Sequence, residues 1–193
     1  MIKLKNGEYT YSKSDYIGGG SFGQVYKCKS RSRQGKTLAV KIMSKTKLDE
    51  YEDYLWNALE REINIQKRVT KSGVPFYVFL YDDFRDSTNV YLIMELCSGG
   101  SLHKLLKKQL SEQEILGYIL QVGIGLLYLH SIGITHRDIK PENVLIQDGV
   151  MKIADFGFAN NSSDLTTNLG TKPYMSPELF NEREELYSEK IDV

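Results

Sequence analysis

The stretch "IGGGSFGQVYKCKS", residues 17–30, decides the fold, because it places a glycine-rich turn directly before a strand-like segment. Gly18, Gly20 and Gly23 follow the spacing G-x-G-x-x-G, which lets backbone N–H groups approach a phosphate closely. The following "VYKCKS", residues 25–30, alternates with a period of two, as strands do. We therefore expect a hairpin whose loop could fold over phosphates.

The glycine spacing alone is a weak signal, because ordinary turns and Rossmann dinucleotide-binding loops use the same pattern. A Rossmann loop opens a helix, whereas residues 25–30 indicate the second arm of a hairpin. The dinucleotide-binding fold is therefore disfavoured, while a structural turn and a phosphate-binding flap both stay open at this point.

Length, charge and cysteine content limit the classes of protein to which the chain can belong. The 193 residues can bury one core, either as a single domain or as two lobes around a cleft. Lys plus Arg and Asp plus Glu both number 25, so no net field attracts nucleic acid, which we do not expect as a partner. Cys28 and Cys97 stand far apart, and residues 1–13 lack the apolar stretch of a secretory signal. We expect an intracellular, cytoplasmic protein with reduced thiols.

The most apolar stretch, residues 115–129, contains Gln121 and three glycines and is shorter than the roughly 20 residues that cross a bilayer. It follows "SEQE", residues 111–114, which predicts a capping box at the start of a helix. We expect a buried core helix here and no transmembrane segment.

Two segments of the first half predict a strand and a helix. "KTLAVKIM", residues 36–43, alternates as a strand that puts Lys41 on the same face as Ala39. "DYLWNALEREINIQKRV", residues 53–69, has helical periodicity with Glu62 on the apolar stripe. An unpaired carboxylate there would be costly, so an ion pair with Lys41 is one interpretation. The alternative is that Lys41 reaches solvent and Glu62 lies at the edge of the helix.

Two motifs of the second half contain residue types that phosphoryl transfer requires. They are "HRDIKPENVLI", residues 136–146, and "KIADFGFA", residues 152–159. With the glycine loop and "AVK" they form the ordered set G-x-G-x-x-G-x-V, A-V-K, H-R-D-x-K-x-x-N and D-F-G. This set resembles the eukaryotic protein kinase family, over residues 16–193.

The resemblance implies an α+β, bilobal fold. The N-lobe, an antiparallel sheet plus one regulatory helix, would span residues 1–96, with a Gly/Ser-rich hinge at 97–101. Residues 102–193 would form a mainly helical and incomplete C-lobe.

The resemblance also implies an activity, the transfer of the γ-phosphate of Mg-ATP to a Ser or Thr hydroxyl of a protein. Asp138 would orient the attacking hydroxyl as the catalytic base, and Lys140 would place an ammonium beside the transferring phosphoryl. Lys41, held by Glu62, would bridge phosphate oxygens.

The same resemblance assigns the ligands of ATP and Mg²⁺. Asn143 and Asp155 offer hard oxygen atoms to the metal. The adenine would lie against Val25, Ala39 and Leu145. The full set of expected ATP-binding residues is Ile17, Gly18, Gly19, Gly20, Ser21, Phe22, Gly23, Gln24, Val25, Ala39, Lys41, Glu95, Cys97 and Leu145.

Local details point to a branch of the family and to regulation. Lys140 and Thr171 resemble the serine/threonine branch, and "KIADFGFA" with "YMSPEL" is similar to the autophagy-initiating (ULK-type) kinases. Thr167 stands at a position where phosphorylation activates many members of the family, and Arg137 would bind its phosphate. This implies an upstream activating kinase or a regulatory subunit.

Gln66 occupies a position that relatives keep apolar, so its amide either has a partner or loosens the helix.

The last residues, "YSEKIDV" at 187–193, resemble the start of the central C-lobe helix. Asp192 would be the buried aspartate that braces the "HRD" turn. We therefore expect a chain cut within the C-lobe, which leaves an inactive fragment as an alternative to an enzyme. A nucleotide-binding pseudokinase or interaction module is a further alternative, although Lys41, Asp138 and the two metal ligands are all present.

Overall fold

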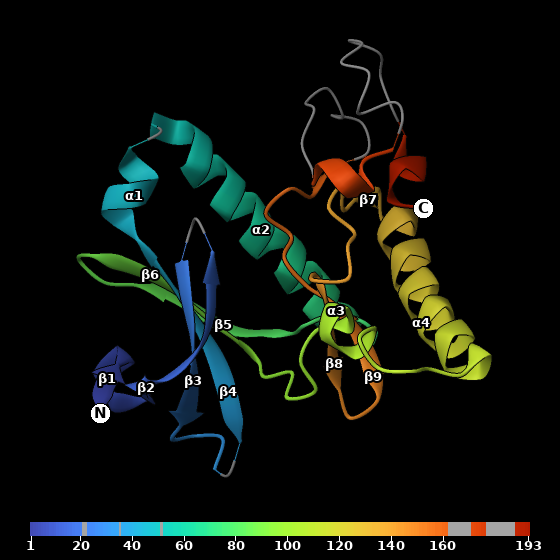
Figure 1. Cartoon of the computed structure of the whole chain (residues 1–193). Helices are drawn as coiled ribbons and strands as arrows, with labels where there is room; N and C mark the ends of the chain where they lie inside the picture. Colours follow the sequence, from blue (N-terminus) through green and yellow to red (C-terminus); the bar gives the residue numbers. More distant parts are fainter. Residues whose placement is uncertain (21–22, 35, 51, 162–170, 177–187) are drawn as a thin grey trace. The chain divides into compact units, whose positions relative to one another are not determined.

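A six-stranded antiparallel sheet occupies the N-terminal half of the chain (Figure 1). The computed structural model describes residues 1–20, 23–34, 36–50, 52–161, 171–176 and 188–193. The strand order is β1-β2-β3-β4-β6-β5. The strands are β1 (Ile2–Leu4), β2 (Tyr9–Gly20), β3 (Gly23–Ser30), β4 (Thr37–Ser44), β5 (Leu80–Arg85) and β6 (Asn89–Glu95).

The chain divides into two compact units. Met1–Leu59 and Phe79–Leu96 form the first, and Glu60–Val78 and Cys97–Val193 form the second. The predicted α+β class, with an antiparallel sheet first and helices dominating later, is confirmed. Residues 60–78 group with the second unit, whereas the sequence prediction put them in the N-lobe; the lobe boundaries therefore stay a prediction.

The carboxylate of Asp82 connects two distant parts of the first unit's sheet. Lys5, in the short 3-10 helix η1 (Lys5–Gly7), lies 2.5 Å from Asp82 Oδ2. The Tyr9 hydroxyl donates to the same oxygen at 2.8 Å, and burial together with this bond raises the pKa of Tyr9. Since Tyr9 is on β2 and Asp82 on β5, the contact joins strands that stand four places apart in the sheet order.

Helix α2 (Glu52–Ser72) begins in the first unit and ends in the second. The stripe predicted from the helical spacing consists of Leu55, Leu59, Glu62, Gln66 and Val69. The last four are buried, whereas Leu55 is only half-buried. The short helix α1 (Lys45–Asp49) precedes it, and Asp49 accepts a hydrogen bond from the indole nitrogen of Trp56 at 2.8 Å.

The second unit surrounds an apolar core built on α2 and α4 (Glu112–Ser131). Its small strands carry the loops of the candidate site. β7 (Ile134–Thr135) pairs with β10 (Asn160–Asn161), and β8 (Val144–Gln147) pairs with β9 (Val150–Ile153). The turn between β8 and β9 is Asp148-Gly149, both with positive φ, as a type I′ hairpin requires. Three short helices, α3 (Leu102–Leu105), η2 (Lys172–Tyr174) and η3 (Glu189–Asp192), complete the described elements.

Helix α4 starts as predicted but is less buried than predicted. Ser111 and Glu114 form the reciprocal capping box. The prediction of a buried core helix is wrong, however, because only Gly125, Leu126 and Leu129 are buried, while Leu127 is 70% exposed. The helix is apolar on nearly every side, yet among the described residues only one side of it is buried. The other exposed apolar residues of α4 are Ile115, Leu116, Ile119, Leu120 and Ile124.

By length and composition α4 could also cross a bilayer, the one described helix of which this is true. Core helices of soluble proteins pass the same test, so the finding is weak support for a membrane span.

Cys28 and Cys97 are not joined in a disulfide, as predicted. Burial raises the pKa of the Cys28 thiol to about 12, so this thiol stays protonated near neutral pH.

Candidate active site

The loop between β7 and β8 holds Asp138 at the centre of a hydrogen-bond network. Asp138 is only 4% exposed. Its Oδ2 accepts from Lys140 Nζ at 2.7 Å and from Asn143 Nδ2 at 2.8 Å, and its Oδ1 accepts from the Thr171 hydroxyl at 2.6 Å. Lys140 also donates to Thr171 Oγ1 at 2.6 Å. The network therefore gathers a buried carboxylate, an ammonium, an amide and a hydroxyl at one point.

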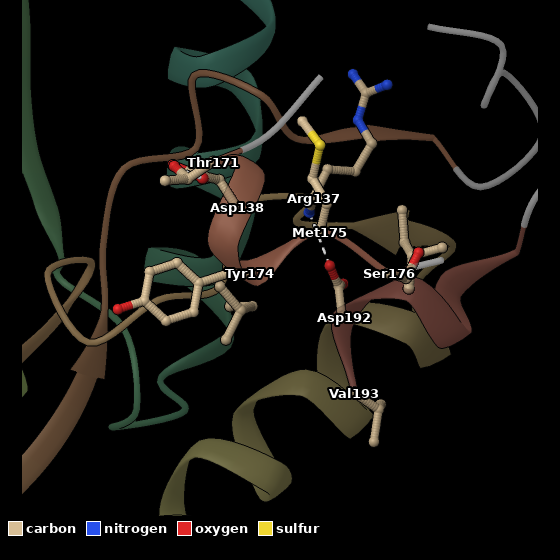
Figure 2. Close-up of a pocket in the computed structure, with 10 residues that line it drawn as sticks. Arg137, Asp138, Thr171, Tyr174, Met175, Ser176, Asp192 and Val193 are labelled. Atoms are coloured by element: carbon tan, nitrogen blue, oxygen red, sulfur yellow. Dashed lines mark hydrogen bonds between the residues drawn. The ribbon is translucent and has the colours of Figure 1, made fainter. Parts of the chain in front are cut away.

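A second buried aspartate fixes the backbone of this loop. Asp192 Oδ2 accepts from the His136 backbone N–H at 2.8 Å, and Oδ1 accepts from that of Arg137 at 2.7 Å. Figure 2 shows Asp192 directed at the backbone of Arg137. Arg137 has φ of 68°, a left-handed conformation that costs energy for a residue with a Cβ. The brace predicted for Asp192 is thus present, and it holds a strained turn in place.

The two expected metal ligands are neighbours in the second unit. The Ala154 backbone N–H donates to the carbonyl oxygen of Asn143 at 2.8 Å, which ties Asn143 to the residue before Asp155. Asp155 is exposed and has φ of 63°, again left-handed. Because Asn143 donates its amide nitrogen to Asp138, its amide oxygen is the atom available for a cation. An amide oxygen and a carboxylate are ligands that Mg²⁺ accepts.

The "DFG" turn, residues 155–157, lies against His136 and Glu62. Phe156 and His136 are both buried, and their ring centroids are 5.3 Å apart, so the two rings pack together in the interior of the second unit. A Cβ built on Gly157 would lie 3.8 Å from Glu62 Oε2 and 3.3 Å from Asp155 Oδ1. The Glu62 carboxylate therefore lies at this turn, on the buried side of α2.

In the first unit, three of the expected ATP-binding residues form a row across the sheet. Gly18 on β2 pairs with Val25 on β3, which pairs with Lys41 on β4. Ala39, two residues before Lys41, shares its face of β4 and pairs with Met94 on β6. Glu95 follows on β6, paired with Leu38. Lys41 and Glu62 belong to different units, so their ion pair stays a prediction.

The other expected ATP-binding residues of the second unit lie beside β8. Leu145 forms a bridge with Ser101, and the Gly99 N–H donates to the Ile146 carbonyl at 2.9 Å. A Cβ on Gly99 would stand 2.8 Å from that carbonyl oxygen, so this close approach requires glycine. Cys97 is half-buried two residues earlier.

The buried amide of Gln66 has a partner. Gln66 is 3% exposed, and its Nε2 donates to the Val78 carbonyl at 3.1 Å. Val78 in turn donates its N–H to Ile153 O at 3.0 Å, at the end of the strand that leads to Asp155. Of the two possibilities left open by the sequence, the structure supports an amide that connects α2 to its neighbours.

A cavity of about 390 Å³ opens beside Asp138 and Thr171 (Figure 2). Its wall includes Tyr174 and Met175, so it offers both a polar end and an apolar side. The remaining lining residues are Arg137, Ile139, Ser176, Ile191, Asp192 and Val193.

Some predicted residues cannot be placed, and some placed residues were not predicted. Ser21, Phe22 and Thr167 lie outside the described residues. Thr171 was singled out from the sequence only as a mark of the serine/threonine branch, not as a partner of Asp138. His130, whose Nε2 lies 2.9 Å from Asp192 Oδ2, was missed, since nothing in the sequence relates residues 62 positions apart.

Comparison with known proteins agrees with the motifs. The model of the protein kinase domain family matches residues 11–193. An Aurora kinase of Candida glabrata is 39% identical over 183 residues, which cover 92% of this chain and 49% of that protein. Aurora kinase A-B of Xenopus laevis is also 39% identical, with 92% and 43% covered. Calcium-dependent protein kinase 5 of Plasmodium falciparum is 36% identical, with 100% and 34% covered.

The chain thus spans about half the length, or less, of these curated relatives. The narrower resemblance to autophagy-initiating kinases finds no support in them.

Proposed function

Because this chain belongs to the protein kinase family, we propose that it is a serine/threonine protein kinase that transfers the γ-phosphate of ATP to a protein hydroxyl. The observation that carries the proposal is the network around Asp138, which holds an acceptor carboxylate and a lysine ammonium 2.7 Å apart. Phosphoryl transfer needs alignment and charge neutralisation more than covalent help, and these groups supply both.

In the proposed mechanism, Asp138 orients the substrate hydroxyl and accepts its proton as the hydroxyl oxygen bonds to phosphorus. Thr171 now donates to Asp138 Oδ1, so a substrate hydroxyl could take its place or share that oxygen. Lys140 reaches both Asp138 and Thr171, and its ammonium would neutralise charge on the transferring phosphoryl.

We assign metal binding to Asn143 and Asp155, whose oxygen chemistry fits Mg²⁺. Among the residues that the structure describes, no group of three His, Cys, Asp or Glu side chains could hold a metal by itself. The phosphates of ATP would therefore have to complete the shell, as they do for many Mg²⁺ sites. When bound, the metal would neutralise phosphate charge and align the γ-phosphate. The ATP contacts of Lys41, Val25, Ala39, Glu95, Cys97 and Leu145, and an intracellular location, are proposed from the resemblance.

Two measurements on the same preparation test the proposal. Thermal shift with and without Mg-ATP reports nucleotide binding, and transfer of radioactive phosphate to a generic protein substrate reports catalysis. We expect both, with phosphoserine or phosphothreonine as the product. Asp155→Asn is the matched control, since it keeps the shape of the side chain and removes the charge that we assign to the metal.

Absence of binding would contradict the nucleotide site itself. Binding without transfer would overturn the enzymatic proposal and favour a nucleotide-binding interaction module, a role for which the exposed apolar residues of α4 would offer a surface. Transfer to tyrosine alone would contradict the assignment to the serine/threonine branch.

A further inference from the structure

The loop between β3 and β4 presents a serine in a strongly basic setting. Residues 27–36 contain five Lys or Arg residues and no Asp or Glu. Ser32 lies in this loop and is exposed, with Arg31 and Arg33 exposed on either side of it. A kinase whose substrate groove is acidic recognises this kind of charge pattern.

A nearby serine with the same flanking pattern is hidden. Ser30 has a lysine three residues before it, a basic residue directly before it and an arginine directly after it, and so does Ser32. Ser30 is 7% exposed, however, and its hydroxyl accepts from the Arg33 N–H at 3.2 Å while donating to Glu8. Sequence pattern alone cannot separate the two serines, but accessibility in the folded protein does.

The Ser32 hydroxyl is also part of a clamp on the N-terminal segment. It donates to Glu8 Oε1 at 2.6 Å, and the Ser32 backbone N–H donates to the same oxygen at 3.1 Å. The Ser30 hydroxyl adds a third bond at 2.8 Å, and the Arg31 N–H donates to the Glu8 backbone carbonyl at 2.8 Å. Glu8 therefore joins the start of β2 to the loop that carries Ser32.

We propose that Ser32 is a phosphorylation site for an arginine-directed serine/threonine kinase, and that its phosphate releases the Glu8 clamp. The Ser32 oxygen would bond to the γ-phosphorus of ATP as the bond from that phosphorus to the β–γ bridging oxygen breaks. ADP leaves, and the hydroxyl proton passes to the catalytic carboxylate of the modifying kinase. The product has no hydroxyl proton to donate and carries a charge of about −1.5 to −2.

Repulsion makes the modified clamp unstable. The phosphate would be attached to an oxygen that now lies 2.6 Å from a carboxylate oxygen of Glu8, so two anions would compete for one place. Arg31 offers an alternative partner, because its Nε lies 3.9 Å from Glu8 Oε2 and would be drawn to the greater charge. The loop would keep its basic residues but lose the bond from the Ser32 hydroxyl to Glu8, the residue before β2.

The first test maps the site. The Asp138→Asn protein is incubated with a purified arginine-directed serine/threonine kinase and Mg-ATP, so that the result does not depend on the activity proposed for this chain. We expect phosphate on Ser32 and none on Ser30 in the folded protein, and phosphate on both serines in a peptide of residues 25–38. Absence of phosphate on Ser32, or equal labelling of Ser30 in the folded protein, would overturn the site.

The second test measures the clamp by amide hydrogen exchange of Arg31, whose N–H bonds to Glu8. Phosphorylation should accelerate this exchange about tenfold or more, because one bond of the clamp is lost and repulsion is added. Ser32→Ala removes the bond without adding charge and should have a smaller effect. In Glu8→Gln protein, phosphorylation should change the exchange rate little. Unchanged exchange after phosphorylation, or an equal effect of Ser32→Ala, would overturn the release of Glu8.

Discussion

Two buried aspartates of the second unit are held mainly by different kinds of group. Asp192 is 6% exposed and accepts from the backbone N–H groups of His136 and Arg137, with one side-chain contact, to His130. Asp138 is 4% exposed and accepts from side chains, those of Lys140 and Asn143 among them.

The two kinds of donor suit two roles, a structural role for Asp192 and a catalytic role for Asp138. Backbone N–H groups stay where the chain path puts them, so a carboxylate that they hold is fixed with the fold. Side-chain donors can change rotamer without moving the backbone, so they can give way to another molecule. Asp192 therefore serves the strained turn at Arg137, whereas Asp138 can exchange a contact such as that with Thr171 for a substrate hydroxyl.

The largest effect is expected from a variant that removes the catalytic base and leaves the fold intact. Asp138→Asn should lower the rate of phosphate transfer about 10²- to 10⁴-fold, because an amide cannot accept the hydroxyl proton. Its midpoint of thermal unfolding should change little, since Lys140 and Thr171 can rearrange around the amide. Steady-state transfer assays and thermal unfolding of the same preparation measure the two quantities. A large loss of stability with a normal rate would reverse the roles given to the two aspartates.

The second-largest effect is expected from removing the Asp192 carboxylate, which holds the strained turn at Arg137. Asp192→Ala should lower the free energy of unfolding by about 3 kcal/mol, because two buried N–H groups lose their acceptor and His130 loses its partner. Urea unfolding measures the change, with Asp192→Asn as the conservative variant, whose one remaining acceptor oxygen should restore part of the loss. If Asp192→Ala unfolds at the wild-type urea concentration, the brace contributes nothing.

Gln66 is a further test of the structural role, because its side chain donates to a backbone carbonyl. We therefore expect it to stabilise the fold, as Asp192 does, and not to take part in catalysis. Gln66→Leu should lower the free energy of unfolding by about 1 kcal/mol, since the buried Val78 carbonyl loses a donor. It should not raise basal phosphate transfer. Asn64→Leu, at an exposed position of the same helix, is the control and should stay within about 0.5 kcal/mol of the wild type. A gain of activity in Gln66→Leu would show that the amide loosens α2 instead.

Much of this arrangement follows from local sequence signals, and the parts that do not are contacts between distant residues. The alternation of residues 36–43 and the capping box at Ser111 depend on neighbours in the chain, and both predictions are confirmed. The burial of α4 was predicted wrongly, because hydropathy records which residues are apolar and not which side finds a partner. The bond from Thr171 to Asp138, across 33 positions, has no local signal at all.

Glu8 extends the comparison to the first unit and gives the smallest effect. Hydrogen bonds from the Ser32 and Ser30 side chains lower its pKa from 4.5 to about 2. A carboxyl whose pKa is lower in the folded protein stabilises the fold above its unfolded pKa, and that contribution disappears as the pH falls through the folded pKa. The stability of the wild type should therefore decrease between about pH 4.5 and pH 2 more steeply than that of Glu8→Gln, which cannot titrate. Urea unfolding at several pH values measures both slopes. Glu8 is only half-buried, so the difference should be small and should shrink further in salt. Equal slopes would mean that the hydroxyl bonds to Glu8 persist in the unfolded chain or contribute nothing to folding.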